Sequence, residues 1–578
     1  MISSLTVFVD LKAWDIRDVE ARGDDWPTVN DILKASIVPA NVQVIADMHK
    51  NLPGSSKVIW MIDGMNELRS ELSAKVLEAL TNELRGTVRS RLIVADRSDS
   101  RYKGADWRVR LVNPLDSAVV EQHVPIVELV TEEDKRRREL LRSPFFLDVA
   151  ITNEGLTWRS SVQAIHGLFA SRVKLNELEI DVLSAYALSV YEAKAGLAFE
   201  LDDMVRAVGS PIAKRLIESR LVQPVTGTKV SFYHQLLHDY LSSRSVAQRP
   251  ETWVPRYFDA LSFDANTYES VFMVLDQLGS EDAFARYITA LYDWNWFATI
   301  RCVERALSDG WAVPHHLKLM LSAMLCEKRF DPVAGSRARA DSWSSKLDAV
   351  TGFGFARVTT IPGLVAEVEQ FRKGSEPSWF QDWYKLFALI GTPSHVPSEN
   401  EIALLASPNP FIGWIAAQVT RHCNLTDEGA RQIRAIYSGA RHATDDVSCS
   451  IRWRAVHAVG RNPSSDNARM LLSAIDGDSY SWVKYGAVRS LLEMAAISEE
   501  ADSLKFLSEV GARLSKLPQE ALAQVAWATR YEGTTAGWAS RALPLLEAAY
   551  ELQETDKERE QWQNRMEAFK AWAARETS

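Results

Sequence analysis

The strongest constraint on the fold is a short apolar run, residues 58–62, that ends at Asp63. Five apolar residues between turn signals predict a strand buried on both faces, as in a parallel sheet. Asp63 would then lie at the carboxyl end of the strand, where α/β sheets bind ligands. An aspartate there can hold Mg²⁺, and Glu67 is placed to orient or deprotonate a water that attacks a phosphate. The pattern also fits a buried strand followed by a solvated acidic turn.

Residues 1–115 alternate strand-like runs with helical stretches, which is typical of a parallel α/β sheet. Strands are predicted at 7–11, 58–62, 92–95 and 109–112, and a helix at 73–84.

Residues 116–194 are predicted to be helical. A short helix capped by Asp116 or Ser117 should end before Pro125, and a second helix should span 132–141. Pro144 follows the cap Ser143 and suits the first position of a further helix, which by itself needs no ligand.

Residues 195–248 have the layout of a winged helix. Helices are expected at 202–208 and 210–219, and strands at 221–225 and 229–232 flank the hairpin turn Thr226-Gly227-Thr228. The second helix mixes charges, so a role inside the protein is favoured over reading a DNA groove.

From residue 249 to 578, amphipathic helical stretches dominate. Residues 455–459 match residues 487–491, and a related segment at Trp414 precedes Trp453 by a similar interval. These spacings predict HEAT-like helical hairpins that bury one another, with an irregular helical array as the alternative. The 19 tryptophans, many of them in this half, suit either core positions or binding anchors.

Composition narrows the class of protein. A chain of 578 residues predicts three to four domains. The net charge of -10 implies no general polyanion-binding surface, and the basic run 135–138 follows three acidic residues, so nucleic acid is an improbable partner. The four cysteines lack metal-site spacing. We find neither a signal peptide nor an apolar run able to span a bilayer, and therefore expect a cytoplasmic protein with reduced cysteines and no membrane partner.

The order of these segments resembles the NACHT branch of the STAND NTPases, the signal-transduction ATPases with numerous domains. In that family a strand ending in Asp-Gly-x-Asp-Glu is the Walker B element. Here Asp63, Gly64 and Glu67 match, while Asn66 stands where an acid is usual. The resemblance implies that Asp63 binds the metal ion and that Glu67 is a catalytic residue. It also implies that Arg97, the last residue of the sensor-like segment 91–97, faces the phosphates.

Two later segments carry the resemblance further. Pro144 matches the lid proline that packs against adenine in the family. Residues 232–241 are similar to the Phe-x-His-x-x-x-x-Glu-[Phe/Tyr]-Leu signature that ends the winged helix, with Asp239 in place of glutamate. The resemblance implies that His234 reaches the β-phosphate of bound ADP. As an isolated residue, a histidine that opens a helix also fits a capping or core role.

The family's Walker A loop, Gly-x-x-x-x-Gly-Lys-[Ser/Thr], does not occur in this chain. We expect an upstream segment to carry it, with supply by a second polypeptide or loss of the site as alternatives. An upstream segment is favoured because an incomplete parallel sheet exposes an edge. ATP, ADP and Mg²⁺ are therefore expected only if that loop is supplied, and whether the chain is an enzyme stays open.

The predicted fold is mostly α. It consists of a partial P-loop NTPase core (1–115), a helical lid (116–194), a winged helix (195–248) and HEAT-like repeats (249–578). The expected function is the carboxyl-terminal part of a STAND/NACHT ATP-dependent signalling switch. Its repeats would sense a protein or other ligand, activation would bring homo-oligomerisation, and bacterial relatives suggest defence against phage. The alternative is a non-catalytic binding scaffold with a degenerate NTPase remnant.

Overall fold

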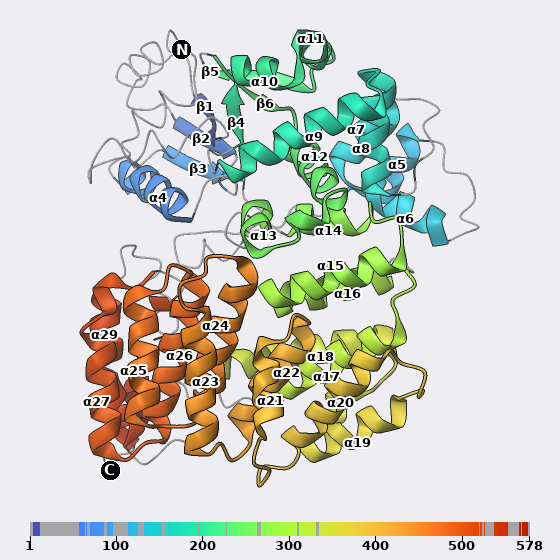
Figure 1. Cartoon of the computed structure of the whole chain (residues 1–578). Coiled ribbons are helices and arrows are strands. Elements are labelled where there is room, and N and C mark those ends of the chain that lie inside the picture. Colours follow the sequence, from blue (N-terminus) through green and yellow to red (C-terminus); the bar gives the residue numbers. More distant parts are fainter. Residues whose placement is uncertain are drawn as a thin grey trace. The chain divides into compact units, whose positions relative to one another are not determined.

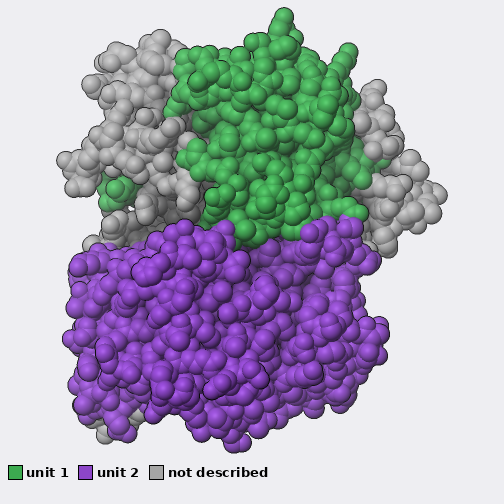
Figure 2. All heavy atoms as spheres, viewed as in Figure 1, with its two compact units in different colours: residues 1–279 green, residues 280–578 purple. Residues whose placement is uncertain are grey.

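In the residues that it describes, the computed structural model is mostly helical with two small sheets (Figure 1). It describes residues 4–11, 57–63, 65, 70–85, 90–95, 114–124, 132–152, 158, 160–193, 197–226, 228–262, 268–308, 311–330, 334–518, 521–522, 525, 537–552, 566–567 and 569–575. The chain divides into two compact units, Met1–Gly279 and Ser280–Ser578 (Figure 2).

Unit 1 begins with a parallel three-stranded sheet in the order β1-β2-β3. Its strands are β1 (Ser4–Asp10), β2 (Lys57–Asp63) and β3 (Ser90–Val94), and α4 (Ser70–Arg85) connects the last two. Asp10 and Asp63 are register partners at the carboxyl ends of β1 and β2. The predicted strand at 109–112 lies outside the described residues.

The prediction that β2 is buried on both faces is correct for only one face. Trp60 and Ile62 are 3% and 1% exposed, whereas Met61 is 38% exposed beside its register partner Ile93, which is 52% exposed. Alternate residues of a strand point to opposite faces, so the two sets differ in burial. A short apolar run does not by itself distinguish a strand covered on one face from a strand covered on two.

Helices follow from residue 117 onward. They are α5 (Ser117–His123), α6 (Glu132–Leu141), α7 (Pro144–Thr152), α8 (Ser161–Gly167), the π-helix η4 (Leu168–Arg172) and α9 (Glu177–Glu192). The Asp116 side chain caps α5 by accepting from the Ala118 N–H at 3.0 Å, as its position before the helix predicts. Asn176 and Glu179 form a reciprocal capping box that fixes the start of α9.

The second sheet of unit 1 is antiparallel, in the order β4-β6-β5. Its elements and those around it are β4 (Ala198–Glu200), α10 (Leu201–Val208), α11 (Ser210–Glu218), β5 (Val222–Thr226), β6 (Lys229–Phe232) and α12 (Gln235–Ala247). Pro224 lies on the edge strand β5, where its missing N–H disrupts no interior pairing. Gly209 takes a φ of +86° between α10 and α11, a backbone conformation that suits glycine.

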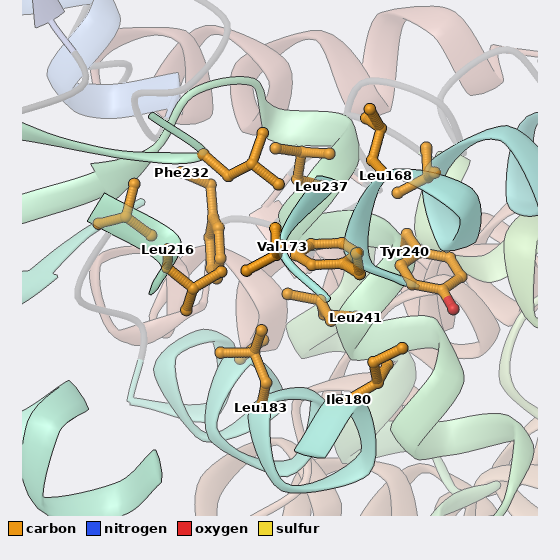
Figure 3. Close-up of a cluster of buried hydrophobic side chains, with 14 of the residues drawn as sticks. Leu168, Val173, Ile180, Leu183, Leu216, Phe232, Leu237, Tyr240 and Leu241 are labelled. Atoms are coloured by element: carbon orange, nitrogen blue, oxygen red, sulfur yellow. The ribbon is translucent and has the colours of Figure 1, made fainter. Parts of the chain in front are cut away.

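A single hydrophobic core joins the helices before residue 194 to the second sheet and α12. Figure 3 shows side chains from η4, α9, α11, β6 and α12 pointing toward one another. Three more helices follow in unit 1: η5 (Pro250–Thr252), α13 (Pro255–Ser262) and α14 (Glu269–Leu275). The predicted repeat region begins at residue 249 and so includes α13 and α14. In the structure these two helices are part of unit 1. Both pack against α12.

The described part of unit 2 is helical, and the following helices have defined bounds. They are α15 (Glu281–Trp294), α16 (Trp296–Ser308), α17 (His315–Glu327), η6 (Lys328–Phe330), α18 (Ala334–Thr351), η7 (Phe355–Arg357), α19 (Ile361–Phe371), α20 (Ser378–Ile390), α21 (Glu399–Ala403), η8 (Leu404–Ala406), α22 (Pro410–His422), α23 (Asp427–Ala440), α24 (Asp446–Ala458), α25 (Ser465–Gly477), α26 (Ser481–Ile497), α27 (Glu500–Gly511), η9 (Leu514–Lys516) and α29 (Trp538–Glu551).

The middle of unit 2 is a two-layer stack of helices. In one layer α20, α22, α24 and α26 pack in succession, and in the other α21, α23 and α25 do so. Neighbours in the chain, α23 with α24 and α25 with α26, pair across the layers (Figure 1). This arrangement is typical of helical-hairpin repeats. Of the two matching segments, 455–459 covers the end of α24 and 487–491 lies within α26, so the match joins neighbouring helices of one layer.

In the part of the chain that the structure describes, no helix is long and apolar enough to cross a membrane. The four cysteines are free thiols, and three of them are buried.

Candidate functional site

Two segments that the sequence singles out meet in unit 1. Helix α7 begins at the exposed Pro144, and the next residue, Phe145, is buried. The ring of Phe145 packs against the imidazole of His234, with 4.4 Å between ring centroids and 32° between ring planes. The start of α7 therefore lies beside the start of α12.

The half-buried His234 is the N-cap of α12. Its Nδ1 atom accepts a hydrogen bond from the Leu236 backbone N–H at 3.1 Å. Because Nδ1 accepts, the proton of the neutral ring is on Nε2, which can donate. A ring N–H at a helix N-terminus suits an anion, since the helix dipole and the first backbone N–H groups attract negative charge. The capping role and the phosphate role are compatible, because they use different nitrogens.

Two further polar residues of this segment, His238 and Asp239, are structural. His238 is buried, with Nε2 2.8 Å from the Ala187 carbonyl oxygen. Asp239 is also buried, and its Oδ1 accepts from the Tyr191 hydroxyl at 2.6 Å and from the Ser270 hydroxyl at 2.7 Å. These bonds fix α12 to α9 and α14. The sequence signature therefore combines one solvent-accessible histidine with residues that hold it in place.

A cavity of about 610 Å³ lies along α8, α9 and α12. The Tyr240 hydroxyl is 2.9 Å from His166 Nδ1, and His166 Nε2 is 3.2 Å from a carboxylate oxygen of Glu177. Arg244 donates to Glu177 at 2.6 Å and to Asp181 at 2.7 Å. The π-helix η4 contributes to the wall, and single π-turns are frequent at functional sites.

The predicted metal and catalytic residues are only partly described. Asp63 ends β2 in register with Asp10, whereas Glu67 and Arg97 lie outside the described residues. Mg²⁺ usually takes one or two protein carboxylates and completes its shell with water and phosphate oxygens. An aspartate at the carboxyl end of a parallel strand, such as Asp63, fits that donor set. No cluster of three or more metal-ligating side chains occurs within the described ranges.

Sequence reasoning missed a pocket of about 280 Å³ in unit 2, lined chiefly by aromatic side chains from α15, α16, α22, α24 and α26. Its signal was present in the spacing of the repeats. Trp414, Trp453 and Tyr485 take corresponding places in three successive repeat segments. Equivalent positions on stacked helices lie side by side, which gathers these rings on one face.

Comparison with protein-family models finds no match for this chain. Comparison with curated proteins likewise finds no matching sequence.

Proposed function

We propose that this chain is the carboxyl-terminal part of a STAND/NACHT-type ATP-dependent signalling switch. The observation that carries the proposal is the contact of Phe145 with His234. It brings the lid proline Pro144 and the winged-helix histidine, the two positions that the family resemblance gives to adenine and to the β-phosphate, to one place. The Nε2 donor of His234 and the exposed Pro144 ring suit a bound nucleotide.

In this proposal ADP holds unit 1 in a resting arrangement through His234, and Asp63 serves Mg²⁺. Exchange for ATP and binding of a ligand by the helical array of unit 2 favour a second, oligomerising arrangement. Such a switch requires only that nucleotide and ligand bind the two arrangements with different affinity. Defence against phage is the cellular role that the resemblance favours.

The second candidate is a binding scaffold without catalysis. It is favoured by Asn66, which removes a carboxylate from the Walker B motif, and by the lack of a Walker A sequence in this chain. In that case the array of unit 2 would bind its partner without a nucleotide cycle.

The test separates the capping role of His234 from its phosphate role. Asparagine caps helices well but lacks the ring N–H, whereas alanine lacks both functions. We would isolate the protein from its own cells as wild type, His234→Asn, His234→Ala and the exposed-neighbour control Tyr233→Ala, and measure co-purifying ADP and thermal unfolding.

Both His234 variants should retain much less ADP than wild type. With nucleotide removed from all samples, His234→Ala should be less stable than His234→Asn by roughly 0.5 to 2 kcal/mol, because alanine lacks the cap. Wild-type levels of ADP in both variants would refute the phosphate role. A wild-type protein without nucleotide, which also fails to bind ADP and Mg²⁺ in solution, would favour the scaffold.

A further inference from the structure

The aromatic pocket of unit 2 repeats one pattern on three stacked helices. Each helix places an aromatic residue and, one turn later, a polar residue in the pocket wall. The pairs are Trp414 and Gln418 on α22, Trp453 and His457 on α24, and Tyr485 and Arg489 on α26. A row of aromatic rings therefore runs beside a row of polar groups.

The rings form a continuous wall. Trp414 and Trp453 meet edge to face at 4.9 Å, and Trp453 stacks with Trp482 at 5.5 Å and 25°. Trp482 in turn contacts Tyr485 at 5.3 Å. These four rings are partly exposed rather than fully buried. Partly exposed stacked rings offer flat apolar faces to a planar ligand.

Hydrogen bonds and close packing fix the positions of the rings in this wall. The Trp414 indole Nε1–H donates to Asp293 at 2.9 Å, and Asp293 also accepts from Arg454 at 2.8 Å. A Cβ atom at Gly486 would lie 2.8 Å from the Trp453 ring, so only glycine lets α26 approach this ring so closely. The rings are thus positioned before any ligand arrives, which lowers the entropic cost of binding.

The side chain of Gln418 has a buried hydrogen-bond acceptor without a donor among the described residues. Its side chain lines the pocket and is 2% exposed, yet its Oε1 atom has no hydrogen-bond partner among the described residues. A buried carbonyl oxygen without a donor costs free energy that a ligand N–H group would recover. The pocket therefore favours a ring whose edge carries a donor.

The charge of the lining is positive. Lys328 and Arg489 line the pocket, and no carboxylate does so within the described residues. Lys328 also pairs with Glu327 at 3.3 Å, and Arg489 also acts on the buried Glu493 carboxylate; neither acid lines the pocket. Two cationic side chains in the lining disfavour a quaternary ammonium ligand, the usual occupant of an aromatic cage, and favour an anion.

We propose that this pocket binds a nucleotide, with its base on the tryptophan wall, a base-edge N–H donated to Gln418 and its phosphate at Arg489 and Lys328. A volume of about 280 Å³ is near the lower end for ligand pockets, about 300 Å³, and suits one small ligand. The inference goes beyond the proposed function, because binding here requires no nucleotide switch in unit 1.

The test is calorimetric titration of the full chain with each of the four ribonucleoside monophosphates, with EDTA present so that no magnesium-dependent site contributes. Three variants are compared with wild type: Trp482→Ala removes a stacking face, Gln418→Leu removes the acceptor, and Trp379→Ala removes a partly exposed tryptophan outside the pocket. His234→Asn reports on unit 1.

At least one nucleotide should bind wild type, Trp379→Ala and His234→Asn alike. Trp482→Ala should bind it roughly tenfold more weakly, because base stacking on an aromatic side chain is typically worth that much. Gln418→Leu should lose affinity most for bases with an edge amino group. If a short oligonucleotide binds more tightly than its monomer, the ligand that the pocket recognises by base stacking and phosphate contact is a nucleic-acid strand rather than a free nucleotide.

Three results would overturn the proposal. The first is no binding by any of the four nucleotides or the oligonucleotide. The second is binding that His234→Asn abolishes and Trp482→Ala leaves intact, which would place the nucleotide in unit 1. The third is tight binding of tetramethylammonium, which would show that the pocket selects cations.

Discussion

Replacing His238 by glutamine should make the stability of unit 1 less sensitive to acid. His238 is fully buried, and its Nε2–H donates to the Ala187 carbonyl oxygen at 2.8 Å. Its Nδ1 atom has no hydrogen-bond partner among the described residues, and the ring stacks on Tyr191 at 3.9 Å. Protonation would place a charge and a new N–H in an apolar site without an acceptor.

Burial therefore lowers the pKa of His238 from 6.5 to about 4, although the bond to Ala187 opposes the shift. In the unfolded chain the imidazole takes up a proton as the pH falls through 6.5, whereas the folded chain resists until about pH 4. The unfolded state binds more protons in this window, so stability falls as the pH falls. Between about pH 7 and about pH 5 the loss from this one residue is about 2 kcal/mol.

Glutamine can retain the donor to Ala187 but does not titrate. We would measure denaturant unfolding of the full chain at about pH 7 and about pH 5 for wild type, His238→Gln and the exposed control His123→Gln. The difference between the two pH values should be about 2 kcal/mol smaller in His238→Gln than in the other two proteins. Equal acid sensitivity in all three proteins would refute the reasoning.

Two predictions concern the packing of unit 2. A Cβ atom at Gly413 would lie 2.3 Å from the buried Arg454 guanidinium, so Gly413→Ala should destabilise the unit by about 1 to 3 kcal/mol. The control Gly439→Ala has open space around the new Cβ atom and should be neutral or stabilising. Both changes would be measured by calorimetric unfolding. Glu493 and Arg421 form an ion pair in which both side chains are 1% exposed, so Arg421→Met should cost about 3 to 5 kcal/mol by denaturant unfolding. A loss as large in Gly439→Ala, or no loss in Arg421→Met, would contradict these accounts.

The ionised state of Glu493 explains why that pair is costly to break. Burial alone would raise the pKa of Glu493, but three guanidinium groups lower it well below its ordinary value. These belong to Arg421, Arg461 and Arg489. The carboxylate therefore stays charged in the core, and removal of one partner leaves the remaining charges less well compensated.

The sequence by itself determined the local elements of this protein. Helix α6 spans Glu132–Leu141 as predicted, Asp116 caps α5, and Pro144 is the first residue of α7. Each of these depends on a few neighbouring residues: a cap, an absent N–H or an amphipathic period. The parallel pairing of β1 with β2 also follows from alternating strand and helix patterns.

Only the tertiary structure decided which distant residues meet. His234 and His238 share one short segment, yet the first caps a helix at the surface and the second is a buried neutral core residue. The contact of His234 with Phe145 depends on how α7 packs beside α12. The tryptophan wall exists because α22, α24 and α26 stack in register. Hydrophobic periodicity fixes which face of a helix is buried, but the partner of that face is set by packing across the whole unit.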